Sequence, residues 1–277
     1  NSIASDAIGA STGTYALAIG VNAQALSGGS TAIGTNTIAT TNDADLTKVS
    51  PSTAIGSGSQ AYGPGAIAIG ATDSDSGRAI SNGQHALAVG NAARANGFGS
   101  AAIGGMTVAS LDYATAVGQQ AQATARMSSA FGTFTQATAN FSTAVGYLSN
   151  ATAENALAVG RSAQATGVNA VALGSSPFAS ANSVAIGTQA TANSSNAVAV
   201  GMIAKATGAG STAVGMGSQA NAFYATGLGA NAQALNTNTI AIGYNAQATG
   251  TQAISIGTGN VVSGANAGAI GDPSYVS

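Results

Sequence analysis

The most regular feature of the chain is a short apolar pattern that ends in glycine and returns with a 14-residue period. Ala-aliphatic-Gly, or a close variant, keeps that period from Gly90 to Gly174 and again from Gly187 to Gly271. The step from Gly174 to Gly187, which separates the two runs, is shorter by a single position. A fixed period of this kind is the signature of a protein built from stacked structural repeats.

The residues before the glycine predict one short strand in each repeat. In NSVAIG (residues 182–187), Val184 and Ile186 share one face while Ser183 and Ala185 share the other, because side chains alternate along a strand. Both faces are apolar or small, which is the pattern of a strand covered on both sides. We assign the larger side chains to the interior, so the predicted core of the roll is Val184, Ile186, Val198 and Val200.

The residues after the glycine predict a second, half-buried strand. Ala190 and Ala192 alternate with Gln189, Thr191 and Asn193, so one face is small and apolar and the other is polar. Two strands in each 14-residue repeat make one flattened coil, and successive coils stack as parallel ladders. The fold class predicted from the sequence is therefore all-β, a parallel β-roll (β-solenoid).

A single stack of such coils has a second small-residue face that needs cover. A symmetric homo-oligomer would provide that cover by placing the face at its axis, and we expect three chains. The residues that we assign to this axis column are Ala156, Ala158, Ala170, Ala172, Ser183, Ala185, Ala197 and Ala199.

These motifs resemble the YadA-like head repeat of trimeric autotransporter adhesins. The resemblance rests on NALAVG (155–160), NAVALG (169–174), NSVAIG (182–187) and NAVAVG (196–201), and it extends over nearly the whole chain. It implies a left-handed, homotrimeric roll displayed outside a Gram-negative outer membrane, with an anchor elsewhere in the full protein. It also implies adhesion to matrix proteins of the collagen, fibronectin and laminin class, or to other surfaces. We expect one head domain over residues 1–277, as part of a longer passenger.

Composition argues against several other functions. Only 5% of the residues are charged, and six scattered Lys and Arg residues cannot form the basic patch that nucleic acids require. The chain has no cysteine, one histidine (His85) and one glutamate (Glu154), so no catalytic pair can be assembled from a motif. We expect no enzyme activity and no cofactor. The pair Asp73 and Asp75 alone is too small a ligand set to predict a Ca²⁺ site.

Two insertions interrupt the period and hold much of the charge. The steps from Gly34 to Gly56 and from Gly70 to Gly90 are both longer than the period, so loops are predicted around 35–52 and 71–85. Inserted loops in solenoids are frequent binding sites, although loops also carry charge simply because they are solvated. The candidate ligand-facing residues of these loops are Asp43, Asp45, Lys48, Asp73, Asp75 and Arg78.

A polar column four positions after the glycine is the second candidate ligand face. These positions should share one outer stripe of the roll, which could bind a ligand or only maintain solubility. The stripe comprises Arg94, Gln122, Gln164, Lys205, Gln233 and Gln247.

Two other functions remain open for a rigid solenoid of low charge. An ice-binding solenoid would show threonine in one fixed column, whereas threonine here changes position between repeats. A mechanical spacer would hold another domain away from the cell without binding anything itself.

Overall fold

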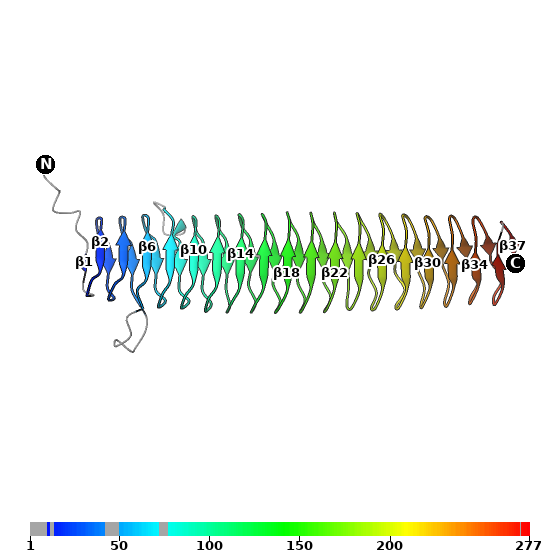
Figure 1. The fold of residues 1–277 in the computed structure, drawn as a ribbon, viewed down its shortest axis with the longest axis horizontal. Helices are drawn as coiled ribbons and strands as arrows, with labels where there is room; N and C mark the ends of the chain where they lie inside the picture. The colour runs from blue at the N-terminus through cyan, green and yellow to red at the C-terminus, as the bar shows by residue number, and fades with distance from the viewer. Residues whose placement is uncertain (1–9, 12–13, 42–49, 72–76, 272) are drawn as a thin grey trace. The chain divides into compact units, whose positions relative to one another are not determined.

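The structure is a computed structural model that describes residues 10–11, 14–41, 50–71, 77–271 and 273–277. The chain divides into two compact units, Asn1–Phe141 and Ser142–Ser277. Both units are built in the same way. Each repeat contributes one three-residue strand, which carries an even number, and one two-residue strand, which carries an odd number (Figure 1).

The first unit contains strands β1 to β17. Its three-residue strands are β2 (Leu17–Ile19), β4 (Thr31–Ile33), β6 (Thr53–Ile55), β8 (Ile67–Ile69), β10 (Leu87–Val89), β12 (Ala101–Ile103), β14 (Thr115–Val117) and β16 (Ser129–Phe131). Its two-residue strands are β1 (Ala10–Ser11), β3 (Gln24–Ala25), β5 (Ile38–Ala39), β7 (Gln60–Ala61), β9 (Ile80–Ser81), β11 (Arg94–Ala95), β13 (Val108–Ala109), β15 (Gln122–Ala123) and β17 (Gln136–Ala137).

The second unit contains strands β18 to β37. Its three-residue strands are β18 (Thr143–Val145), β20 (Leu157–Val159), β22 (Val171–Leu173), β24 (Val184–Ile186), β26 (Val198–Val200), β28 (Thr212–Val214), β30 (Thr226–Leu228), β32 (Ile240–Ile242), β34 (Ile254–Ile256) and β36 (Gly268–Ile270). Its two-residue strands are β19 (Asn150–Ala151), β21 (Gln164–Ala165), β23 (Phe178–Ala179), β25 (Thr191–Ala192), β27 (Lys205–Ala206), β29 (Gln219–Ala220), β31 (Gln233–Ala234), β33 (Gln247–Ala248), β35 (Val261–Val262) and β37 (Tyr275–Val276).

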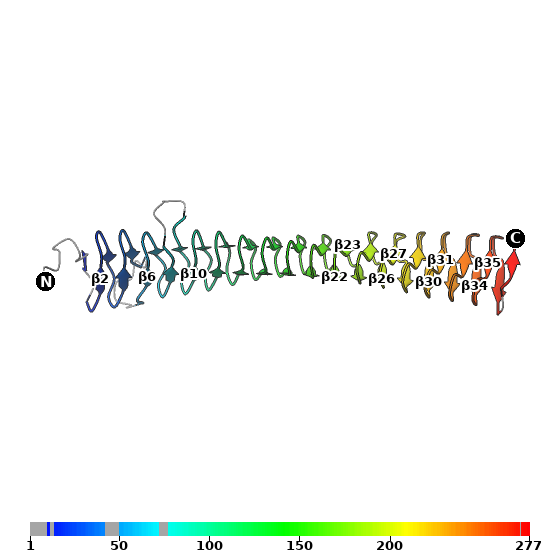
Figure 2. The same ribbon diagram turned by 90° about the horizontal axis from the view of Figure 1, so that it is seen from above.

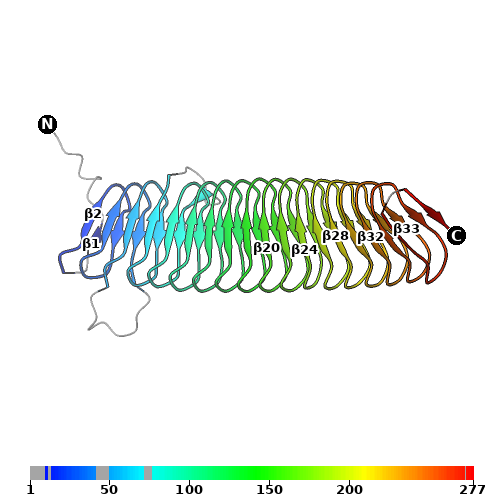
Figure 3. The same cartoon turned by 45° about the vertical axis from the view of Figure 1, so that its right-hand side comes forward.

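Within each unit, strands of one kind pair in parallel with the same kind in the next coil. In the first unit Ala18 pairs with Ala32, and in the second Ala172 pairs with Ala185. The even and odd strands therefore form two separate sheets. Strands β23, β27 and β31 lie on one side of the second unit, opposite β22, β26 and β30 (Figure 2). The succession of coils within each unit can be followed in the oblique view (Figure 3). The predicted all-β parallel solenoid is confirmed.

Departures from the 14-residue period lie in the turns and leave the ladders in register. The long step from Gly34 to Gly56 lies between β4 and β6, yet Thr31 still pairs with Thr53. The short step from Gly174 to Gly187 tightens the turn between Ala179 and Val184, and Val171 still pairs with Val184. Register is therefore set by the strands, and turn length varies around them.

The turns depend on residues with positive φ at fixed positions. Each motif glycine from Gly187 to Gly271 has a wide positive φ, as in Gly187 at +126°. Two further turn positions adopt the left-handed region, where asparagine is common. One is the residue two positions after the motif glycine, as in Asn231, and the other is the residue two positions before nearly every even strand, as in Asn169.

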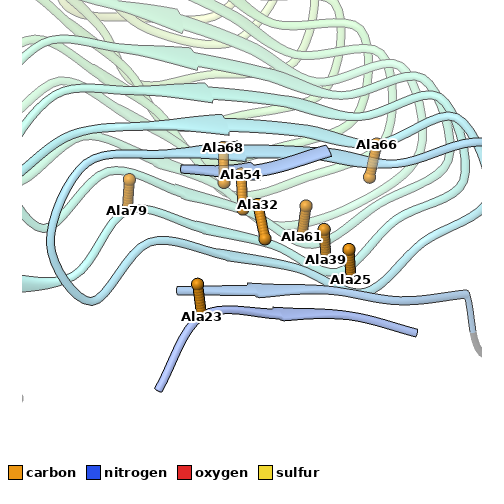
Figure 4. Packing of buried hydrophobic residues seen from close by; sticks show 9 residues of the cluster. All are labelled: Ala23, Ala25, Ala32, Ala39, Ala54, Ala61, Ala66, Ala68 and Ala79. Carbon is orange, nitrogen blue, oxygen red and sulfur yellow. The ribbon is translucent and has the colours of Figure 1, made fainter. Parts of the chain in front are cut away.

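The interior of the coils is filled with alanine, serine and threonine. Ala32, Ala54 and Ala68 come from the even strands, and Ala25 and Ala39 from the odd strands, and all five are fully buried. Their methyl groups point toward one another between the two sheets (Figure 4). Some interior hydroxyl groups bond to backbone carbonyls, as the Ser183 hydroxyl donates to the carbonyl oxygens of Ser180 and Ala192, at 2.8 and 2.9 Å, whereas the buried hydroxyls of Ser100 and Ser211 have no such partner.

This interior corrects the sequence-based assignment of the two faces of the even strands. The residues predicted to form the core point outward: Val184, Val198 and Val200 are half-buried, and Ile186 is 37% exposed. The predicted axis column lies inside the roll and is inaccessible to another chain. Its members, at most 1% exposed, are Ala156, Ala158, Ala170, Ala172, Ser183, Ala185, Ala197 and Ala199.

The physical reason for the reversal is the small cross-section of the coil. Strands of three and two residues joined by short turns bring the sheets so close that methyl and hydroxymethyl groups fill the gap. A branched aliphatic side chain does not fit there in most coils. The fully buried Val262 in β35 is an exception. The odd strands follow the prediction, with Ala190 and Ala192 buried and Gln189 exposed.

Among the residues that the structure describes, no helix is long and apolar enough to cross a membrane.

Candidate functional surfaces

The even strands present a strip of aliphatic side chains on the outside of the coil. The third position of the even strands is aliphatic, apart from Phe131 in β16, whereas the first position is aliphatic in some strands and Thr, Ser, Ala or Gly in others. The small residue between them is buried in nearly every coil. In the second unit this aliphatic strip includes Leu157, Val159, Val171, Leu173, Val184, Ile186, Val198 and Val200. In the first unit the corresponding Ile67 and Ile69 are 38% and 37% exposed. Contiguous apolar surface of this kind marks an interaction face.

The odd strands present the predicted polar stripe on the opposite side of each coil. Every predicted member is the first residue of its strand, with a buried alanine beside it. Arg94, Gln122, Gln164 and Lys205 are exposed, while Gln233 and Gln247 are half-buried and pair with each other in register. The structure thus places these residues on one outward face within each unit.

Most of the charged loop residues lie outside the described residues. These are Asp43, Asp45, Lys48, Asp73 and Asp75. Arg78 is described and half-buried. The aliphatic part of its side chain lies over the turn at Gly58, where an added Cβ would be 3.2 Å from the Arg78 Cγ.

An aromatic cluster on the turns of the first unit was missed by sequence reasoning. The ring centroids of His85 and Phe98 are 5.7 Å apart, and those of Phe98 and Tyr113 are 5.4 Å apart, both with edge-to-face geometry. Gly99 leaves room for this contact, since an added Cβ would be 3.3 Å from the Tyr113 ring. The available signal was that His85 and Tyr113 hold the same turn position two coils apart, with Gly99 at that position in the coil between them and Phe98 beside it.

A groove of about 620 Å³ runs along the second unit beside the polar stripe. Thr191, Lys205 and Gln219 line one side, and they are successive residues of the stripe paired in register. Turn residues line the other side, among them Ile203 and Gly217. Sequence reasoning placed Lys205 on an outer face but did not find the groove, which depends on the absence of a side chain at Gly217.

The described surfaces bring together groups that suit binding. Within the described ranges, no cluster of three or more His, Cys, Asp or Glu residues could hold a metal ion. His85 and Glu154 are both exposed and lie on turns of different units. The residues that are brought together are hydroxyls, amides, aliphatic groups and single charges, which suit noncovalent recognition.

Comparison with known families identifies the repeat. The family model described as the YadA head domain repeat matches residues 11–37, 51–72, 81–97, 95–121, 123–149, 151–176, 180–202, 203–218 and 220–246. The crystal structure of the collagen-binding domain of the Yersinia adhesin YadA is 23% identical in sequence. That alignment covers 67% of this chain and 88% of the crystallised one, with a TM-score of 0.29. A search of curated protein sequences gave no match.

Proposed function

Because the chain belongs to the YadA head repeat family, whose members are bacterial surface adhesins, we propose that it forms the ligand-binding head of a trimeric autotransporter adhesin. In this proposal the chain is displayed outside a Gram-negative outer membrane and binds without catalysing a reaction. Residues 1–277 act as one head domain of a longer passenger.

The observation that carries the proposal is the contrast between the two outer faces of the coil. The aliphatic strip is only half-buried in a single chain, and contact of its remaining surface with water is unfavourable. A symmetric trimer with three strips facing its axis removes them from water. The polar stripe lies on the opposite side of the coil and remains available to a ligand. Trimer formation thus depends on the strip and not on the buried alanines.

The proposed partners are matrix proteins of the collagen, fibronectin and laminin class. Gln occupies the stripe position in the neighbouring strands β15 and β17 and again in β29, β31 and β33, so weak contacts can add along these parts of a fibrous partner. The charged insertions around 35–52 and 71–85 provide additional groups for such contacts. Threonine leads only β25 among the described odd strands, and it leads β4, β6, β14, β18, β28 and β30 among the even strands. Other residues interrupt this even-strand column, so the described strands carry no continuous threonine array of the kind that an ice-binding face needs.

The experiment measures assembly and binding on the same protein. Light scattering should give a mass near three chains, either for the chain alone or when it is fused to a trimeric coiled coil. Surface plasmon resonance against immobilised collagen, fibronectin and laminin should then show binding to at least one of them. A folded monomer in both forms would contradict the trimer. A trimer that binds none of the three would favour the spacer function.

A further inference from the structure

We propose that the groove beside Lys205 is a binding site for an acidic saccharide, a polymer of sugar units that carry carboxylate groups. This inference goes beyond matrix-protein adhesion and rests on the groove itself. The groove lies within the second unit, and its lining comes from successive coils around β25, β27 and β29.

Lys205 supplies the only charge among the described residues that line the groove. Its side chain is exposed, and its in-register neighbours Thr191 and Gln219 are both neutral. No acidic residue belongs to that described lining, so the ammonium group has no carboxylate partner within the groove. A single cation among neutral polar groups fits a ligand that brings one carboxylate to this coil and uncharged polar groups to its neighbours, since a charge-assisted hydrogen bond is stronger than a neutral one.

The other lining groups are those that bind sugar rings. Gln189 and Gln219 offer amides, Thr191 and Ser176 offer hydroxyls, and Ile203 is 43% exposed. Amides and hydroxyls can exchange hydrogen bonds with ring hydroxyls, while an aliphatic side chain packs against the C–H face of a ring. Hydroxyl and amide groups come from several successive coils, so a chain of sugar rings can make polar contacts on both sides of Lys205.

Gly217 creates the space that the ligand would occupy. It has a φ of +65°, and an added Cβ would be 2.5 Å from the Asn231 Oδ1 and 3.9 Å from the Ile203 Cδ1. The equivalent turn position holds asparagine in the next two coils, at Asn231 and Asn245. The glycine therefore widens the groove at this coil, and asparagine is a substitution that the turn conformation accepts.

The backbone around the groove is already paired, which disfavours a peptide that binds by adding a strand. The amide nitrogens of Ile203, Lys205 and Gln219 donate to the carbonyl oxygens of Thr188, Ser218 and Ala232, each at 2.8 Å. Strand addition needs an open sheet edge with free backbone groups. Only side chains are available to the ligand here, and that condition suits a saccharide.

The test is isothermal titration calorimetry of the full 277-residue chain with a galacturonic acid hexamer as the probe. Maltohexaose serves as the neutral saccharide, and a hexaglutamate peptide as the acidic ligand that is not a saccharide. We expect the acidic saccharide to bind and the other two to bind at least about tenfold more weakly.

Three variants locate the site. Lys205→Gln should weaken binding by about tenfold or more, and it keeps the fold because Gln219 and Gln233 hold the equivalent position in the next strands. Gly217→Asn should also weaken binding by filling the groove. Arg94→Gln is the matched control, since it removes an exposed cation from the polar stripe of the other unit, and it should leave affinity unchanged.

Several results would overturn the proposal. One is equal loss of affinity in Lys205→Gln and Arg94→Gln, which would indicate general charge attraction. Another is equal binding of hexaglutamate, which would point to an acidic peptide partner. The absence of measurable binding by the hexamer to the folded protein would also reject it.

Discussion

At the residue scale, the motif glycines allow successive coils to approach each other closely. The φ of Gly187 is +126°, and a Cβ at this position would lie 2.6 Å from the carbonyl oxygen of Gly201 in the next coil. Both the backbone conformation and the contact exclude a side chain. Glycine therefore recurs with the period of the repeat because each coil contacts the backbone of the next coil at this position.

The substitution Gly187→Ala should therefore lower the free energy of unfolding by more than about 2 kcal/mol. Gly259→Asn is the matched control, because its φ is +67° and no atom lies within 4 Å of an added Cβ. Asn231 and Asn245 occupy the same turn position in earlier coils. Urea denaturation followed by circular dichroism would measure both, and equal midpoints would contradict the argument.

A second residue-scale prediction concerns the interior. Ala123 in β15 is fully buried between the sheets, whereas its neighbour Gln122 is exposed. Ala123→Leu should destabilise the chain by about 3 kcal/mol, because the sheets must separate to admit the larger side chain. Gln122→Leu should change stability by less than about 1 kcal/mol. Thermal unfolding of the two variants would distinguish an alanine interior from an outward alanine face.

At the element scale, strands hold the register while turns absorb changes in length. Removing residues 42–49 would restore the 14-residue period between Gly34 and Gly56. Because Thr31 and Thr53 already pair in register, the deletion should leave the denaturation midpoint nearly unchanged. If the loop contributes to adhesion, affinity for the matrix ligand should fall at the same time.

One alanine inserted after Ala185 in β24 is the contrasting change. It would reverse the inward and outward faces of the rest of the strand and break the pairing of Ile186 with Val200. The variant should be strongly destabilised. Urea denaturation followed by circular dichroism should show a much lower midpoint for the insertion than for the deletion of residues 42–49. Similar stability of the insertion and the deletion would mean that the strands do not control register.

The same distinction explains how far the sequence predicted the fold. The 14-residue period located both strands of each coil, and the alternation around Ala190 and Ala192 gave the correct inner face of the odd strands. The even strands carry apolar or small residues on both faces, so alternation alone did not reveal which face is inside. The coil's cross-section decides that question, and it depends on turns and on both sheets together.

The candidate sites were predicted unevenly for a related reason. The outward stripe of Gln122, Gln164 and Lys205 could be found from the sequence, because each of these residues lies four positions after a motif glycine. The groove depends on Gly217 and on side chains from neighbouring coils, which no single repeat contains. The aromatic cluster of Phe98 and Tyr113 likewise needs two coils in contact.

At the scale of the whole molecule, assembly should respond to the aliphatic strip. Ile186 is 37% exposed in one chain and belongs to the strip that we place at the trimer axis. Ile186→Asp should leave the fold of the single chain intact, since the side chain points away from the interior, yet three carboxylates near the axis should prevent association. Light scattering should then give the mass of one chain, with β-rich circular dichroism retained.

Gln164→Asp is the control for that experiment, because it places the same charge on the opposite, polar face. It should remain a trimer. If both variants lose assembly, or if neither does, the aliphatic strip is not the surface through which the chains associate, and the trimer must use another interface.

The small-residue interior, in which the central alanine of most even strands repeats, also has a genetic consequence. Ala144, Ala158 and Ala172 occupy the same inner position of successive coils, so each coil offers its neighbours nearly the same surface. A duplication or loss of fourteen codons would add or remove one whole coil without requiring compensating changes elsewhere. Recombination between repeats can therefore change the reach of the protein, while selection acts separately on the outward residues that each copy carries.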